Sequence, residues 1–178
     1  MIVAVYGETD KRPVIYTLMK LFQKLGDTCL VSNDRHYKRL LPDNESMGNY
    51  QNVFIAVTDA MPDEVFSEMG YEEDDFENLI FDNTFPENTD LIIFVEGCEV
   101  TELERETLEY VGEYSTIGLG FGKNVVPYTA DMFKKIEIIE GKKFLTEVDK
   151  RVTHKVAELV SKPLNMPVSS ICKVVSKR

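Results

Sequence analysis

Residues 1–26, MIVAVYGETDKRPVIYTLMKLFQKLG, give the clearest indication of the fold class. Ile2–Tyr6 is an apolar, β-branched run, which predicts a buried strand. Gly7 and the charged residues after it predict a turn. Pro13–Leu25 then carries apolar residues at helical spacing, and Gly26 stands where helices commonly end. A strand, a short loop and a helix in this order predict the first unit of a parallel sheet.

The rest of the chain alternates in the same way. Further short apolar runs predict strands at Thr28–Ser32, Val53–Thr58 and Leu91–Val95, and a weaker one within Ser115–Tyr128. Helices are predicted at Glu72–Phe81, Glu99–Val111 and Phe144–Val160, with a loop at Leu41–Gln51. This alternation predicts a single three-layer α/β domain over residues 1–165, with a mainly parallel sheet of five or six strands flanked by helices. Residues 166–178 are predicted to be a basic C-terminal tail.

Acidic residues dominate the first two-thirds of the chain. Residues 1–113 hold 8 basic and 25 acidic residues, a net charge of −17, whereas residues 114–178 carry a net charge of +6. No Lys, Arg or His occurs in the 65 positions from Leu40 to Glu104. This distribution argues against a general duplex-DNA binder, which needs cations over its footprint, and against adsorption to anionic lipid.

Other classes of protein are excluded by simple counts. No apolar run approaches the roughly 20 residues of a membrane span. The three cysteines are far apart and form no CxxC pair, which argues against a disulfide framework and a thiolate zinc site. They fit a reducing compartment, so we expect a cytoplasmic protein.

The first loop is placed like a phosphate-binding loop but lacks its chemistry. Such a loop needs glycines whose N–H groups close around phosphate, a lysine for the β/γ-phosphates, and a Ser or Thr for the metal. Here no GK[ST] sequence occurs, and two carboxylates would repel a polyphosphate. The loop is therefore predicted to be a degenerate phosphate loop, made of Gly7, Glu8, Thr9, Asp10, Lys11 and Arg12.

Residues 1–34 resemble the start of the ParA/MinD-type P-loop ATPases, which have a deviant Walker A motif. Both have an apolar strand, a Gly/Lys loop, a helix ending in leucine–glycine, and a strand leading to an acidic residue. Residues 90–97, DLIIFVEG, resemble the family's Walker B strand, whose terminal carboxylate helps to hold Mg²⁺; Glu96 stands in that place. Residues 144–160 match its closing helix in character. The resemblance implies a P-loop NTPase-like fold, with a Rossmann/flavodoxin-like arrangement as the alternative.

Two further resemblances are looser. Residues 57–61 together with residues 7–10 resemble Toprim domains, but Tyr6 and Met61 stand where that family has acidic Mg²⁺ ligands. Residues 90–97 and 118–128 resemble nucleoside deoxyribosyltransferase-like domains, with Thr116 in the place of the nucleophilic glutamate. This second resemblance predicts a helix at Ser115–Phe121, whereas the ParA/MinD-like one predicts a strand.

Carboxylates follow several of the predicted strands. Ligands of open α/β sheets bind beyond the carboxyl ends of the strands. Asp34, Asp59 and Glu96 lie at such positions and are candidates for an acidic or metal-binding cluster, with the metal left unknown. A solvated acidic face is the alternative. His36 is a candidate base without a visible partner, so no catalytic residue is assigned.

These features predict a ParA/MinD-like protein that has lost a functional Walker A motif and is inactive or weakly active. It is expected to bind a protein within a partitioning, pilus or conjugation assembly, the system being implied only by the resemblance. The expected partner is a basic protein or another copy of the chain. No cofactor is expected, and Mg-nucleotide is disfavoured. The alternatives are a nucleoside- or nucleotide-processing enzyme, and an acidic mimic that binds a basic protein.

Overall fold

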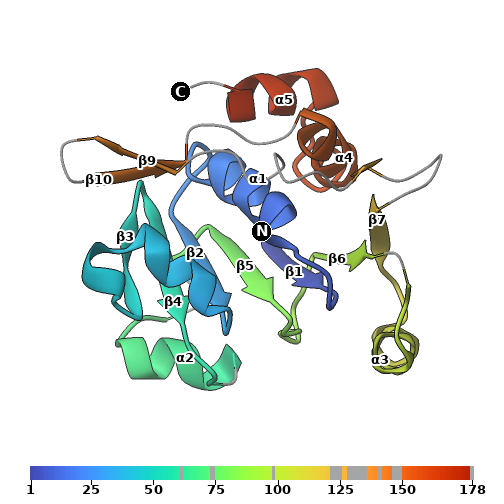
Figure 1. Cartoon of the computed structure of the whole chain (residues 1–178), viewed down its shortest axis with the longest axis horizontal. Helices are drawn as coiled ribbons and strands as arrows, with labels where there is room; N and C mark the ends of the chain where they lie inside the picture. The colour runs from blue at the N-terminus through green and yellow to red at the C-terminus, as the bar shows by residue number, and fades with distance from the viewer. Residues whose placement is uncertain are drawn as a thin grey trace.

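A single mainly parallel sheet organises the molecule (Figure 1). The computed structural model describes residues 1–60, 62–72, 75–97, 99–120, 126–127, 136–139, 142–145 and 150–176. Within these residues the sheet has eight strands in the order β3-β4-β2-β5-β1-β6-β7-β8. They are β1 (Ile2–Tyr6), β2 (Thr28–Ser32), β3 (Met47–Tyr50), β4 (Val53–Val57), β5 (Asn78–Asp82), β6 (Leu91–Glu96), β7 (Ser115–Gly120) and β8 (Val126–Pro127).

All neighbouring strands of this sheet run parallel except β3, which pairs antiparallel with β4. The remaining elements are the helices α1 (Arg12–Phe22), α2 (Pro62–Met69), α3 (Glu102–Val111), α4 (Lys150–Val160) and α5 (Val168–Ser176), two short 3₁₀ turns (Arg35–Leu40 and Pro42–Asn44), and a separate antiparallel pair of β9 (Ile136–Ile139) and β10 (Lys142–Leu145).

Helices cover both faces of the sheet, so the molecule has three layers (Figure 1). Successive side chains of a strand point to opposite faces. In β6, Ile93 and Val95 join the core beneath α1, α4 and α5, whereas Phe94 packs with Leu108 of α3 on the other face. α2 covers the same face as α3, over β2, β4 and β5. The predicted three-layer α/β fold with a mainly parallel sheet is confirmed, and the sheet is wider than the five or six strands expected.

The largest error of the sequence prediction lies at Glu72–Phe81, which was expected to be a helix. Residues 78–82 form β5, and all five of them are buried. β5 pairs with β2 on one side and with β1 on the other, so it lies near the middle of the sheet. A short apolar run can form either a strand or a helix. Here the run forms a strand, because it pairs with both β1 and β2.

Other boundaries also differ from the prediction. The expected loop Leu41–Gln51 contains the edge strand β3, and the expected helix Phe144–Val160 begins in β10 before α4 starts at Lys150. Residues 146–149 lie outside the described residues. Ser115–Gly120 is a strand, as the ParA/MinD-like resemblance predicts, whereas Phe121 lies outside the described residues.

The expected C-terminal tail contains α5, which packs on the domain. Ile171 is fully buried and Val175 is 1% exposed, and both belong to the core cluster shared by α1 and α4. Residues 168–176 are therefore part of the packed structure. None of the helices that the structure describes has the length and apolar character needed to cross a membrane.

Candidate functional site

The carboxyl ends of β1, β2 and β5 meet beside the first loop and enclose a polar cavity. The cavity has a volume of about 320 Å³. Its lining combines four acidic, two basic and several neutral polar side chains, namely Glu8, Thr9, Asp10, Lys11, Arg12, Asn33, Asp34, His36, Tyr37, Asp82 and Asn83. The whole predicted phosphate loop except Gly7 therefore faces this cavity, as expected for a loop at the carboxyl edge of a parallel sheet.

Lys11 is held inside the protein by a carboxylate at the end of β5. Its Nζ lies 3.3 Å from Oδ1 of Asp82 and donates a hydrogen bond of 2.7 Å to the carbonyl oxygen of Gly7. The side chains of Lys11 and Asp82 are 11% and 2% exposed. The hydroxyl of Ser32, at the end of β2, donates to Oδ2 of Asp82 at 2.7 Å.

Burial raises the pKa of the Asp82 carboxyl above its ordinary value, although Lys11 and Ser32 both act to lower it. Oδ1 of Asp82 accepts no hydrogen bond of good geometry from the described residues, so Lys11 is its source of compensation. The ammonium group of Lys11 and the carboxylate of Asp82 therefore each offset the cost of burying the other's charge.

The N-terminus of α1 is occupied by the protein's own groups. The carboxylate of Asp10 accepts a hydrogen bond of 3.1 Å from the backbone N–H of Arg12, and it also binds the Arg12 guanidinium through Nε and a terminal nitrogen. Pro13 has no N–H to offer, and the N–H of Val14 donates to the carbonyl oxygen of Lys11 at 2.9 Å. The N–H groups of the first three residues of α1, Arg12 to Val14, are thus absent or already used, although N–H groups at this end of a helix commonly bind anions.

Gly7 fixes the path of the loop. Its φ is +141°, and a Cβ at this position would lie 2.4 Å from the carbonyl oxygen of Val95 in β6. Its N–H donates to Oδ1 of Asn83 at 3.3 Å. The next N–H, that of Glu8, donates at 2.8 Å to Glu104, a carboxylate that is 2% exposed and also caps the N-terminus of α3. Hydrogen bonds to Asn83 and to Glu104 therefore hold the start of the loop in place.

Asp34 and its neighbours form the far wall of the cavity. Oδ1 of Asp34 accepts the backbone N–H of His36 at 2.9 Å and lies 2.6 Å from Nδ1 of the same histidine. Burial opposes ionisation of Asp34, but the bonds to His36 outweigh it and lower the pKa of the carboxyl below its ordinary value. The Tyr37 hydroxyl is fully buried and has no hydrogen-bond partner among the described residues.

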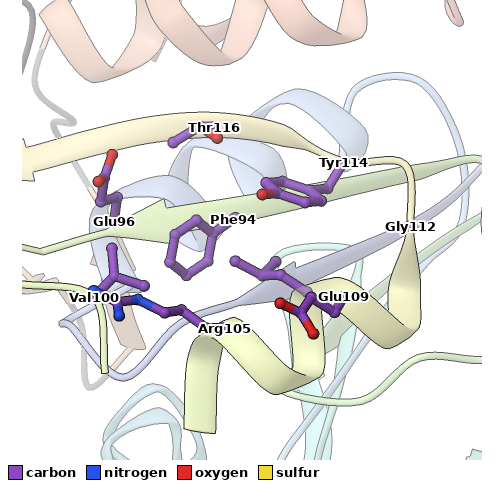
Figure 2. A pocket seen from close by; sticks show the side chains of 9 residues that line it. Phe94, Glu96, Val100, Arg105, Glu109, Gly112, Tyr114 and Thr116 are labelled. Carbon is purple, nitrogen blue, oxygen red and sulfur yellow. The ribbon is translucent and has the colours of Figure 1, made fainter. Parts of the chain in front are cut away.

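A second cavity of about 530 Å³ lies between α3 and the β6–β7 edge of the sheet. Figure 2 shows its floor of Phe94, with the ring of Tyr114 at one end and the carboxylate of Glu96 at the other. The rings of Phe94 and Tyr114 pack edge to face, with their centroids 6.1 Å apart. Val100, Arg105, Leu108, Glu109, Gly112 and Thr116 complete the lining. The cavity is apolar at its base and charged at its rim, as small-molecule sites commonly are.

The three carboxylates proposed as a cluster do not share a site. Asp34 lines the loop cavity, Glu96 lines the cavity beside α3, and Asp59 is exposed after β4 and lines neither of the two. No group of three or more His, Cys, Asp or Glu side chains among the described residues is arranged to hold a metal ion. Glu96 is the last residue of β6, whereas the carboxylate that pairs with Lys11 is Asp82, at the end of β5.

Sequence reasoning missed Asp82 because the strand that carries it was expected to be a helix. The signal was present in residues 78–82, NLIFD, which are an apolar run ending in an aspartate. It was hidden by the acidic residues just before it, which favour a helix start. Glu104 was also missed, since its contact with the first loop spans 96 positions.

Comparisons with known proteins give only remote likenesses. No protein-family model matches the chain, and no curated protein matches it. Among solved structures, it is similar to the MinD cell division protein of Aquifex aeolicus, with 10% identity, a TM-score of 0.45 and coverage of 98% of this chain and 94% of that one. It is also similar to a putative plasmid partition protein of Borrelia burgdorferi bound to AMPPNP, with 11% identity, a TM-score of 0.46 and 97% coverage of both chains. The fold described above rests on the sheet topology and not on these likenesses.

Proposed function

We propose that this chain is a ParA/MinD-like protein without a working Walker A motif, and that it acts by binding another protein within a larger assembly. The sequence resemblance supplies the family and the type of assembly, which is partitioning, pilus or conjugation. The site geometry supports the proposed loss of nucleotide binding.

The state of the first loop carries this proposal. A triphosphate at this position would need the charge of Lys11 and the free N–H groups of the α1 N-terminus. Lys11 is already paired with Asp82, and Asp10 already accepts the N–H of Arg12. These contacts support the proposal, because a phosphate group would compete with Asp82 for Lys11 and with Asp10 for the N–H of Arg12. A phosphate chain would have to displace two carboxylates and then lie next to them.

Titration calorimetry with Mg-ATP and Mg-GTP, together with a phosphate-release assay, tests this proposal. We expect no binding at micromolar nucleotide and no turnover above the buffer rate. Lys11→Ala is the diagnostic variant, and Lys24→Ala is its control, since Lys24 is an exposed lysine just beyond the other end of α1. Micromolar affinity or turnover that Lys11→Ala abolishes and Lys24→Ala preserves would refute the loss of nucleotide binding.

The cavity beside α3 supports a second candidate, a nucleoside- or nucleotide-binding enzyme. Its aromatic floor suits a flat ring, and Glu96 and Thr116 offer polar contacts at the rim (Figure 2). A thermal-shift screen of nucleosides, NAD and Mg²⁺ tests this candidate. A rise in melting temperature that Glu96→Gln removes would favour the enzyme. Glu99→Gln is the matched control, because Glu99 is exposed and lines neither cavity.

A further inference from the structure

The outer side of α3 exposes large apolar side chains. Leu103 is 59% exposed and Tyr110 is 91% exposed, whereas Leu108, which faces the sheet, is only 7% exposed. Leu103 and Tyr110 are seven positions apart, so they lie two turns apart on one flank of the helix. Burying such side chains is favourable in proportion to the apolar area removed from water. The flank therefore has the composition of a contact surface.

Acidic side chains surround these two residues. Glu102, Glu106, Glu109 and Glu113 are all exposed, and Arg105 is the one basic residue of α3. Glu102 and Glu106 are four positions apart in α3, and like charges at this spacing destabilise a helix. Glu109 lies in the last turn, where a negative charge is unfavourable for the helix dipole. Local helix stability thus does not account for Glu106 and Glu109, whereas Glu102 lies in the first turn, where the dipole favours it. We call Glu102–Glu113, with its exposed Leu103 and Tyr110, the acidic face.

The same chain carries a surface of opposite charge on α4. Lys150, Arg151, His154 and Lys155 are exposed along one side of the helix, and Val152, Val156 and Val160 are buried along the other. Glu158 lies within this row and pairs with His154 and Lys155. The turn after α4 adds the exposed Lys162 and Pro163 and the half-buried Leu164 and Met166. We call this surface, residues 150–166, the basic face; it joins positive charge to apolar side chains.

The acidic and basic faces of one molecule cannot meet each other, because they lie on opposite sides of the sheet. α4 packs on the face of β6 that carries Ile93 and Val95, and α3 packs on the face that carries Phe94 (Figure 1). A contact between them must therefore join two molecules.

We propose that a second copy of this chain docks its basic face on the acidic face, with Tyr110 and Leu103 against the turn after α4. This proposal rests on the proposed protein-binding function and names the partner. The two faces differ, so the contact is head-to-tail. In a dimer, one molecule keeps an unused acidic face and the other keeps an unused basic face. Further copies can bind there, and the result is a row or a closed ring. α3 has only 10 residues, so the contact is small and the association is expected to be weak and concentration-dependent.

Sedimentation velocity on the full chain, from roughly 10 to 300 μM protein, tests the proposal. The wild type is expected to form dimers and larger species at about 50 mM NaCl and to become mainly monomeric at about 0.5 M, where surface charges are screened. Variant one, Glu106→Gln with Tyr110→Ser, damages the acidic face only. Variant two, Lys150→Glu with Lys162→Glu, damages the basic face only. Lys24→Glu is the control, with the same type of charge change outside both faces.

Mixing the two variants gives the most specific readout. Each variant alone is expected to be monomeric at about 50 mM NaCl, with an unchanged circular dichroism spectrum. An equimolar mixture should form dimers and nothing larger, because variant one keeps its basic face and variant two keeps its acidic face. A monomeric wild type, a mixture without dimers, or either variant associating on its own would overturn the proposal. None of these results concerns nucleotide binding, so calorimetry judges the proposed loss of ATP binding separately.

Discussion

Replacing Lys11 with methionine removes one charge of the buried pair and leaves the carboxylate of Asp82 behind. Asp82 is 2% exposed and, among the described residues, would then keep the hydroxyl of Ser32 as its side-chain partner. Breaking a buried ion pair on one side typically costs about 3–5 kcal/mol. Lys11 is itself slightly exposed, so we expect a loss near the lower end, about 3 kcal/mol at pH 7. Replacing both residues, as Lys11→Met with Asp82→Asn, should recover at least about 2 kcal/mol of this loss, because no unpaired charge remains.

The pH dependence of this loss follows from the raised pKa of Asp82. Lys11 lowers that pKa in the wild type, so its removal raises the pKa further. A folded-state pKa above the unfolded one means that the folded protein holds the proton more tightly. The resulting stability is present below the unfolded pKa and is lost as the pH rises through the folded pKa. Lys11→Met should therefore differ least from the wild type near pH 5 and most near pH 7.

Equilibrium unfolding in urea, followed by circular dichroism at both pH values, measures the loss directly. Lys24→Met is the control for removing a lysine from an exposed position of the same region. A loss below about 1 kcal/mol at pH 7, or a loss that is equal at both pH values, would mean that Lys11 does not compensate a buried Asp82 charge.

Three further predictions concern the loop and the core. Gly7→Ala should destabilise the protein by about 2–5 kcal/mol in urea unfolding, because the new side chain strains the backbone and forces it to shift. Gly70→Ala is the control, at a φ of +68° with open space around it, and should cost about 1–2 kcal/mol. Equal losses of stability in the two variants would contradict the close approach of Gly7 to β6. Glu104→Ala should cost about 1–3 kcal/mol, because it leaves two partly buried N–H groups, those of Glu8 and Thr101, without their acceptor. Faster hydrogen exchange at the N–H of Glu8 would show the same loss. Burial raises the pKa of the Cys29 thiol to about 12. Iodoacetamide at pH 8 should therefore modify Cys29 only after denaturation. Rapid alkylation of Cys29 in the native protein would show that β2 is not buried.

The sequence was sufficient to predict those parts of the fold that follow from local patterns. β1 and β2 have the predicted bounds, α3 lies within the predicted helix, and α1 overlaps the predicted helix Pro13–Leu25 but begins one residue earlier, at Arg12. These segments have clear apolar periodicity and end at residues that favour turns. Residues 7–11 form the connection between β1 and α1, as the strand and helix patterns on either side of them predict.

The remaining features depend on contacts between residues that are distant in sequence. β5 is a strand because β1 and β2 flank it, and neither contact is visible in residues 72–82. The Lys11–Asp82 pair follows from that placement, so it was not predicted from the sequence. The split of Asp34 and Glu96 between two cavities has the same cause, since both follow strands but on different sides of β1.

The position of β1 also has a consequence for synthesis on the ribosome. β1 is made first, yet both of its neighbours come late: Ile2 pairs with Leu79 of β5, and Val3 pairs with Leu91 of β6. At a synthesis rate of about 5–20 residues per second, roughly 4–15 s pass between the synthesis of β1 and that of its first partner strand, β5. During that interval an apolar strand has two unpaired edges, which is the condition under which chains aggregate or recruit chaperones. Slowing translation between residues 7 and 78 should therefore lower the soluble yield more than slowing it after residue 96.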